Sequence, residues 1–248
     1  MQIPNQMARR TLLRGAVLGG TGIAAASLLA PASASADPGT RILGDATSAM
    51  VFFTDTAGLF GPSEIRAVGV INFRDHKITR QIDYWDGRHF GIANEAALAG
   101  YSSGPVTDFR ESTVGETAAP TMKNVVNKLA EALRHGDGAS AAALFAPGAV
   151  FEDMPAHLHI IGPRSIGTYL TQAASLLPYA GGGTAVRHVV GSAVGGGYEW
   201  TSTGPARRGI IGLELDRWGK ITRLTALWDG SLVDESTLIS LARTAIER

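Results

Sequence analysis

Residues 69–87 read GVINFRDHKITRQIDYWDG, and residues 212–230 read GLELDRWGKITRLTALWDG. Each stretch contains an apolar run, a short polar turn, the tetrapeptide Lys-Ile-Thr-Arg, a second apolar run and the tripeptide Trp-Asp-Gly. Two apolar runs of strand length separated by turn residues are typical of a β-hairpin, here with tight turns at residues 75–76 and 218–219. The same hairpin therefore occurs twice, which indicates an internal repeat.

The repeat extends upstream of both hairpins. Arg41–Gly44 and Arg187–Gly191 each begin a strand at a similar distance ahead of the hairpin that follows. The sequence therefore predicts two copies of a three-strand meander. The first copy begins with strands directly, whereas the second is preceded by an opening half of its own.

That opening half alternates helical and strand patterns. Apolar residues recur at helical spacing between Met122 and His135, and Gly136 ends the pattern. The remaining predicted elements are a short helix at 139–145, a strand at 149–153, a turn at Pro155, a strand at 159–161 and a helix at 165–177. We expect an α+β fold with helices on one face of a curved antiparallel sheet. The family resemblance described below implies that this fold is cone-shaped.

These patterns predict the domain organisation. Residues 37–92 form a partial copy that consists of the meander alone, residues 93–120 form a linker rich in small and polar residues, and residues 121–248 form the complete copy. A lone meander leaves one apolar face uncovered. We therefore expect the partial copy to pack sheet to sheet against the complete one, as an intramolecular pseudo-dimer, or the protein to form a homodimer.

The first 36 residues have the features of an export signal. Arg9 and Arg10 precede an uncharged stretch at 15–30, and the small residues that follow end in a signal-peptidase pattern at Ala36. The pair of arginines followed by Thr-Leu-Leu resembles a twin-arginine signal. We predict export to the periplasm or the exterior with cleavage after Ala36, and no stable membrane span, because the apolar run is short and weak.

Composition excludes several functional classes. The chain has 248 residues, no cysteine, and 22 basic against 22 acidic residues, and removal of a leader with three arginines leaves a net charge of −3. Without a positive field, nucleic acid is not an expected partner. The absence of cysteine excludes a thiolate nucleophile and a disulfide framework. The histidine spacing does not indicate a metal site, the glycine-rich stretches lack the context of a phosphate loop, and no cofactor is predicted.

One segment carries a recognisable resemblance. Residues 145–153 (FAPGAVFED), together with 162–166 (GPRSI) and the closing 227–229 (LWD), resemble the nuclear transport factor 2-like superfamily in its SnoaL-like and ketosteroid-isomerase-like branch. The resemblance covers residues 121–234 in full and 40–91 as a half copy. It implies a cone in which a sheet wraps an apolar pocket that helices close. The superfamily includes isomerases, polyketide cyclases, dehydratases, epoxide hydrolases and ligand binders that are not enzymes, so fold alone does not select a reaction.

Asp153 is the strongest catalytic candidate. It resembles the general base of ketosteroid isomerase, which lies at the end of the corresponding strand, and such a carboxylate can move a proton at carbon or oxygen. The alternative is a structural acid that caps backbone amides in the turn before Pro155. The oxyanion-hole donors of that enzyme are missing, because Leu129 and Ile211 occupy their positions. Tyr169 and His188 are candidate substitutes.

The resemblance also implies a pocket wall and a second acid. The pocket candidates are aromatic or apolar residues of the complete copy: Phe151, Tyr169, Trp200, Leu213 and Trp228. Strand alternation puts Leu224 and Ala226 on the same side as Trp228. Asp229 is a further catalytic candidate, with a turn residue of Trp-Asp-Gly as the alternative, since Asp86 repeats it in the partial copy.

Two functions remain open from the sequence. The first is an exported enzyme without a redox cofactor that uses Asp153 for cyclisation, isomerisation, dehydration or epoxide opening of an apolar small molecule, such as a polyketide or a terpenoid. The second is a protein of the same fold that binds a small ligand or serves for association and is not an enzyme.

Overall fold

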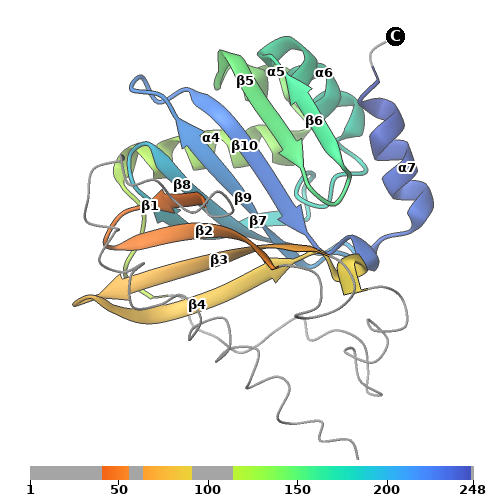
Figure 1. The fold of residues 1–248 in the computed structure, drawn as a ribbon. Coiled ribbons are helices and arrows are strands. Elements are labelled where there is room, and N and C mark those ends of the chain that lie inside the picture. Colours follow the sequence, from red (N-terminus) through yellow and green to blue (C-terminus); the bar gives the residue numbers. More distant parts are fainter. Residues whose placement is uncertain (1–40, 56–63, 91–113, 247–248) are drawn as a thin grey trace, which may run out of the picture. The chain divides into compact units, whose positions relative to one another are not determined.

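The computed structural model describes residues 41–55, 64–90 and 114–246. The predicted export signal and most of the predicted linker lie outside the described residues. Residues Asp37–Arg248 form one compact unit, in which the described strands make two sheets (Figure 1). The boundaries of the partial copy, the linker and the complete copy stay a prediction.

The small sheet comprises four strands in the order β1-β2-β3-β4. Their bounds are β1 Arg41–Gly44, β2 Ser48–Asp55, β3 Ile65–Arg74 and β4 Lys77–Trp85, and all neighbours are antiparallel. The strand at 48–55 was absent from the three-strand prediction. The tight turn between β3 and β4 is present, and its residues Asp75 and His76 have φ values of 51° and 60°. Positive φ at both central residues is the geometry that suits the twist of a two-residue hairpin.

The large sheet comprises six strands in the order β6-β5-β10-β9-β8-β7. Their bounds are β5 Phe145–Asp153, β6 Leu158–Ile161, β7 Thr184–Gly191, β8 Gly195–Ser202, β9 Arg208–Leu215 and β10 Ile221–Trp228. One pair departs from the predicted antiparallel arrangement, because β5 runs parallel to β10. The predicted turn at 218–219 is part of a longer loop, in which Gly219 has a φ of 76°.

Four α-helices and two short 3-10 segments complete the described residues. The helices are α4 Pro120–His135, α5 Gly138–Ala142, α6 Pro163–Ala173 and α7 Glu235–Thr244, and the 3-10 segments are η1 Gly87–Phe90 and η2 Gly230–Leu232. Helix α4 ends where the sequence predicts, because Gly136 adopts the left-handed conformation that closes a helix. Helix α7 was not predicted.

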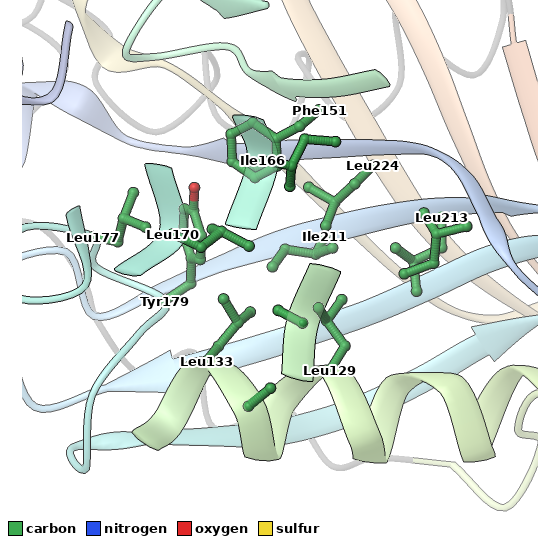
Figure 2. Packing of buried hydrophobic residues seen from close by; sticks show 14 of the residues in the cluster. Leu129, Leu133, Phe151, Ile166, Leu170, Leu177, Tyr179, Ile211, Leu213 and Leu224 are labelled. Carbon is green, nitrogen blue, oxygen red and sulfur yellow. The ribbon is translucent and has the colours of Figure 1, made fainter. Parts of the chain in front are cut away.

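Helices and the main core cover one face of the large sheet. Along β10, Leu224, Ala226 and Trp228 face this core, as strand alternation predicts. Figure 2 shows Leu129 and Leu133 projecting from α4 toward the side chains on the sheet. Helix α4 contacts β7 and β8, and α6 contacts β5 and β6. The predicted α+β class, with helices on one face of the complete copy, is confirmed.

The small sheet packs against the other face of the large sheet. A second buried cluster draws Leu43, Met50, Val68, Val70 and Tyr84 from the small sheet and Val190, Ile210 and Leu227 from the large one. The sheets approach closely at Gly212, where an added Cβ would lie 2.6 Å from the Phe52 ring. The approach of Phe52 therefore depends on glycine at this position, since real Cβ contacts are not this short.

Candidate active site at the end of β5

Asp153 lies at the last position of β5, with its side chain directed into the main core. Residues two apart on a strand share a face, and Phe151 belongs to that core. Asp153 is paired with Ala226 on the parallel strand β10, and the next amide, of Met154, donates to the Ala226 carbonyl at 3.0 Å. The side chain of Asp153 is fully buried. Backbone pairing therefore fixes a carboxyl group inside an apolar interior.

Three donors surround that carboxyl group. The Ala156 amide donates to Oδ1 at 3.0 Å, and the Tyr179 hydroxyl donates to Oδ2 at 2.7 Å. The indole Nε1 of Trp228 lies 3.2 Å from Oδ1 and 3.3 Å from Oδ2, and donates between them. The donors come from the turn after β5, the loop after α6 and the end of β10. A buried carboxylate is stable only when donors such as these are hydrogen-bonded to it.

Burial dominates the electrostatics of the site. It raises the pKa of Asp153 from 3.8 to about 6, against the opposing effect of the three donors. The charge of nearby Asp86 also raises this pKa. Desolvation disfavours the charged form of an acid, whereas hydrogen bonds to that form favour it. A carboxyl group with a pKa about one unit below neutral pH can accept and return a proton.

Two further donors in the same core have no partner among the described residues. These are the Tyr169 hydroxyl and the Trp200 indole nitrogen, both buried. The Tyr169 ring packs against Phe151 with centroids 5.5 Å apart, and Trp200 packs against Tyr179 at 5.9 Å. Burial raises the pKa of Tyr169, and the Asp153 charge raises it further. An unpaired buried donor is costly, so an acceptor atom of a water or a ligand would be favoured beside these groups.

The partial copy contributes an ion pair beside this site. Arg88 pairs with the buried Asp86 at 2.5 Å, and its guanidinium also donates to the Pro155 carbonyl in the turn that Asp153 caps. The hydrogen bond with Asp86 raises the pKa of Arg88. Sequence analysis missed Arg88, although it directly follows the repeated Trp-Asp-Gly. Segment η1, which follows β4, therefore supports the turn after β5.

Asp229 has a structural position. Its Oδ1 accepts the Gly87 amide at 3.0 Å and the Ser231 hydroxyl at 2.6 Å, and the Ser231 amide at 3.0 Å. It thus caps η2 and joins the two copies of Trp-Asp-Gly, which contact each other. These bonds fit the turn-residue alternative, and none of them involves Asp153. A catalytic role for Asp229 stays a prediction that this placement does not support.

His188 lies on the other face of the large sheet. Its Nε2 is 3.1 Å from Asn72 Oδ1 on β3, and the side chain is buried between the two sheets. Burial lowers the pKa of His188, with Arg80 and Arg187 lowering it further and Glu199 and Glu116 raising it. A strand residue on this face cannot reach the core that contains Asp153. The structure therefore does not bring His188 and Asp153 together.

The five pocket candidates do share one interior. Phe151, Tyr169, Trp200, Leu213 and Trp228 all belong to the main core. Trp228 donates a hydrogen bond to the carboxyl group of Asp153. Sequence analysis missed its other side-chain donor, Tyr179. The only signal was a lone aromatic residue in the Pro-Tyr-Ala-Gly turn at 178–181.

Neither a metal nor a membrane span is indicated within residues 41–55, 64–90 and 114–246. No group of three or more histidine, aspartate or glutamate side chains there has a metal-binding arrangement. None of the helices described is both long and apolar enough to cross a bilayer.

Comparisons with known proteins give structural likeness only. No protein-family model and no curated protein matches the chain. A steroid delta-isomerase from Pseudomonas aeruginosa has 16% identity and a TM-score of 0.39, covering 52% of this chain and 90% of its own. An uncharacterised protein with a cystatin-like fold from Silicibacter pomeroyi has 15% identity and a TM-score of 0.41, covering 51% and 85%.

A SnoaL-like protein of unknown function from Burkholderia thailandensis has 9% identity and a TM-score of 0.39, covering 44% of this chain and 96% of its own. These values carry no inference about activity. The solved structures similar to this chain thus include cystatin-like, SnoaL-like and steroid-isomerase proteins.

Proposed function

We propose that the protein is an enzyme in which Asp153 moves a proton on a small apolar molecule. The observation that carries the proposal is the Asp153 carboxyl group, fully buried, with a pKa of about 6 and a hydrogen bond from Tyr179. A structural acid would be expected to have a depressed pKa, because its partners stabilise the charged form. Here burial outweighs the partners, as it does at sites where a base works near neutral pH.

The chemistry follows from the groups present. The ionised carboxylate takes a proton from a substrate carbon or hydroxyl, and the protonated acid returns it elsewhere on the same molecule. Negative charge that develops on a substrate oxygen needs donors. Tyr169 and Trp200 supply a hydroxyl and an indole N–H without partners among the described residues. Isomerisation, cyclisation, dehydration and epoxide opening all use this combination of base and donors.

The surroundings favour an apolar substrate. The side chains around the carboxyl group are aromatic and aliphatic, so a polar molecule would lose its hydration without compensation. A polyketide or a terpenoid meets this requirement. The donor pair of ketosteroid isomerase has no counterpart at Leu129 and Ile211, which are buried core residues. We also propose that the protein acts after export, on the basis of its first 36 residues.

One observation favours a second candidate, a binding or association protein. Both oxygens of Asp153 are already paired with donors of the protein itself, and buried hydrophobic side chains pack in the same core. In this alternative the small sheet takes the place of a second subunit. Deletion of residues 37–100 would then expose the face formed by Val190, Ile210 and Leu227 and cause dimers or aggregates, which size-exclusion chromatography would detect.

Mass spectrometry of the purified protein tests the enzyme proposal. A bound small molecule is extracted, identified and offered to the wild type, to Asp153→Asn and to the control Asp75→Asn, which changes an exposed turn carboxylate. We expect Asp153→Asn to lose at least about 100-fold in turnover, the size of a general-base contribution, and Asp75→Asn to be unaffected. A ligand that is retained by Asp153→Asn and unconverted by the wild type would instead support the binding protein.

A further inference from the structure

A groove lies between α6 and the end of α7. It has a volume of about 550 Å³, within the range of sites for small molecules. Six polar residues line it, together with Tyr169: Arg164, Ser165, Thr168, Gln172, Arg243 and Thr244. The two arginines are exposed and come from different helices, since Arg164 lies in the first turn of α6 and Arg243 in the last turn of α7.

The charged side chains that line this groove among the described residues are both positive. Several arginines in the described part of the chain pair with acids, as Arg134 does with Glu131 and Arg223 with Glu152. Arg164 and Arg243 have no such partner there, and no acid within residues 41–55, 64–90 and 114–246 lines the groove. Two guanidinium groups supply up to ten N–H donors of fixed geometry, which match the oxygens of a carboxylate. The groove therefore favours an anion.

The rest of the lining is apolar. Ile160, Ala245 and Ile246 line the groove alongside Tyr169. Tyr169 also belongs to the main core, where burial raises the pKa of its hydroxyl and the Asp153 charge raises it further. Tyr169 is therefore part of both the groove lining and the core into which Asp153 is directed. A ligand with a charged end at the arginines and an apolar body along Tyr169 would satisfy both kinds of surface.

We propose that this groove binds a small carboxylic acid with an apolar body, whose carboxylate is held by Arg164 and Arg243. The proposal of an anion site depends only on the groove and its arginines. The statement that this acid is the substrate rests on the proposed function of Asp153, and it narrows the substrate class from apolar molecules to amphipathic acids. Tyr169 is then the wall that such a substrate passes to reach Asp153.

Binding of 4-phenylbutanoate tests the anion site. Calorimetric titration compares it with 4-phenylbutan-1-ol, which has the same body without the charge, and with acetate, which has the charge without the body. We expect the full-length wild type to bind the acid at least about tenfold more tightly than either analogue. The double variant Arg164→Gln/Arg243→Gln should lose the preference for the acid over the alcohol. Arg207→Gln, which removes an exposed arginine outside the groove, should retain it.

Three results would overturn the proposal. Equal affinity for the acid and the alcohol in the wild type would show that no anion is recognised. Equal affinity for acetate would show that the apolar body is not recognised, and an effect of Arg207→Gln as large as that of the double variant would show only a loss of overall charge. Asp153→Asn separates the two proposals. If it binds the acid normally and also turns over the extracted ligand normally, the groove stands and the proposed function fails.

Discussion

Substitution Asp153→Asn should change how stability depends on pH. The folded protein holds the carboxyl proton up to about pH 6, whereas the unfolded chain releases it near the ordinary value of 3.8. Between these values the folded state binds more protons than the unfolded state, so stability falls as pH rises. The difference of about two pH units corresponds to about 3 kcal/mol, at about 1.36 kcal/mol per unit. Asparagine has the shape of the acid and does not ionise, so the stability of the variant does not fall with rising pH for this reason.

Urea denaturation at pH 4, 5, 6 and 7 measures the effect. The free energy of unfolding of Asp153→Asn minus that of the wild type should rise by about 2.4 kcal/mol from pH 4 to pH 7, with most of the rise complete by pH 6. Other carboxyl groups titrate in both proteins and cancel in the difference. The absolute offset between the two proteins does not enter the prediction.

The control is Asp75→Asn, at an exposed turn position with a φ of 51° that asparagine tolerates. Its difference from the wild type should stay within about 0.5 kcal/mol at every pH. A flat difference for Asp153→Asn would refute the reasoning, because it would mean that burial does not outweigh the three donors. A difference that falls with pH would mean that Asp153 is a stabilising structural acid.

Three further predictions concern other contacts. Tyr179→Phe removes a donor from the Asp153 carboxylate, so the pKa of Asp153 in the folded protein should rise. The free energy of unfolding at pH 7, measured by urea titration, should fall by about 1–3 kcal/mol. Glu199→Gln breaks a buried ion pair with an arginine of β4 and should cost about 3–5 kcal/mol by the same assay, whereas Glu131→Gln at an exposed pair should cost less than about 1 kcal/mol. Gly212→Ala places a methyl group against the phenylalanine ring of β2 and should lower stability by about 1–3 kcal/mol, and truncation of that ring to alanine should cancel the added cost in a double-mutant cycle.

The hairpin repeat shows how much of the fold a local sequence pattern predicts. The Lys-Ile-Thr-Arg and Trp-Asp-Gly elements predict two hairpins, and both are present as β3–β4 and β9–β10. Helical spacing and Gly136 predict α4 and its end. The parallel pairing of β5 with β10 was not predicted, because it joins strands about 70 residues apart and no local turn specifies it.

The residues of the candidate site also divide into those that a local sequence pattern predicts and those that it does not. A carboxylate at a strand end before a turn marks Asp153 from the sequence, and alternation places Trp228 on the face of the core. Tyr179 and Arg88 carry no such signal. Their positions depend on how the loop after α6 and segment η1 pack around the turn after β5.

The sequence by itself determined the elements whose cause is local: strand alternation, helix spacing, glycine at a helix end and the repeated hairpin. Only the tertiary structure decided that Asp153 meets Tyr179 and Trp228, and that His188 faces the small sheet instead. The physical reason is that a pKa and a hydrogen bond depend on which side chains exclude water from a group. That exclusion is set by packing between elements distant in sequence, here the two sheets and the loop after α6.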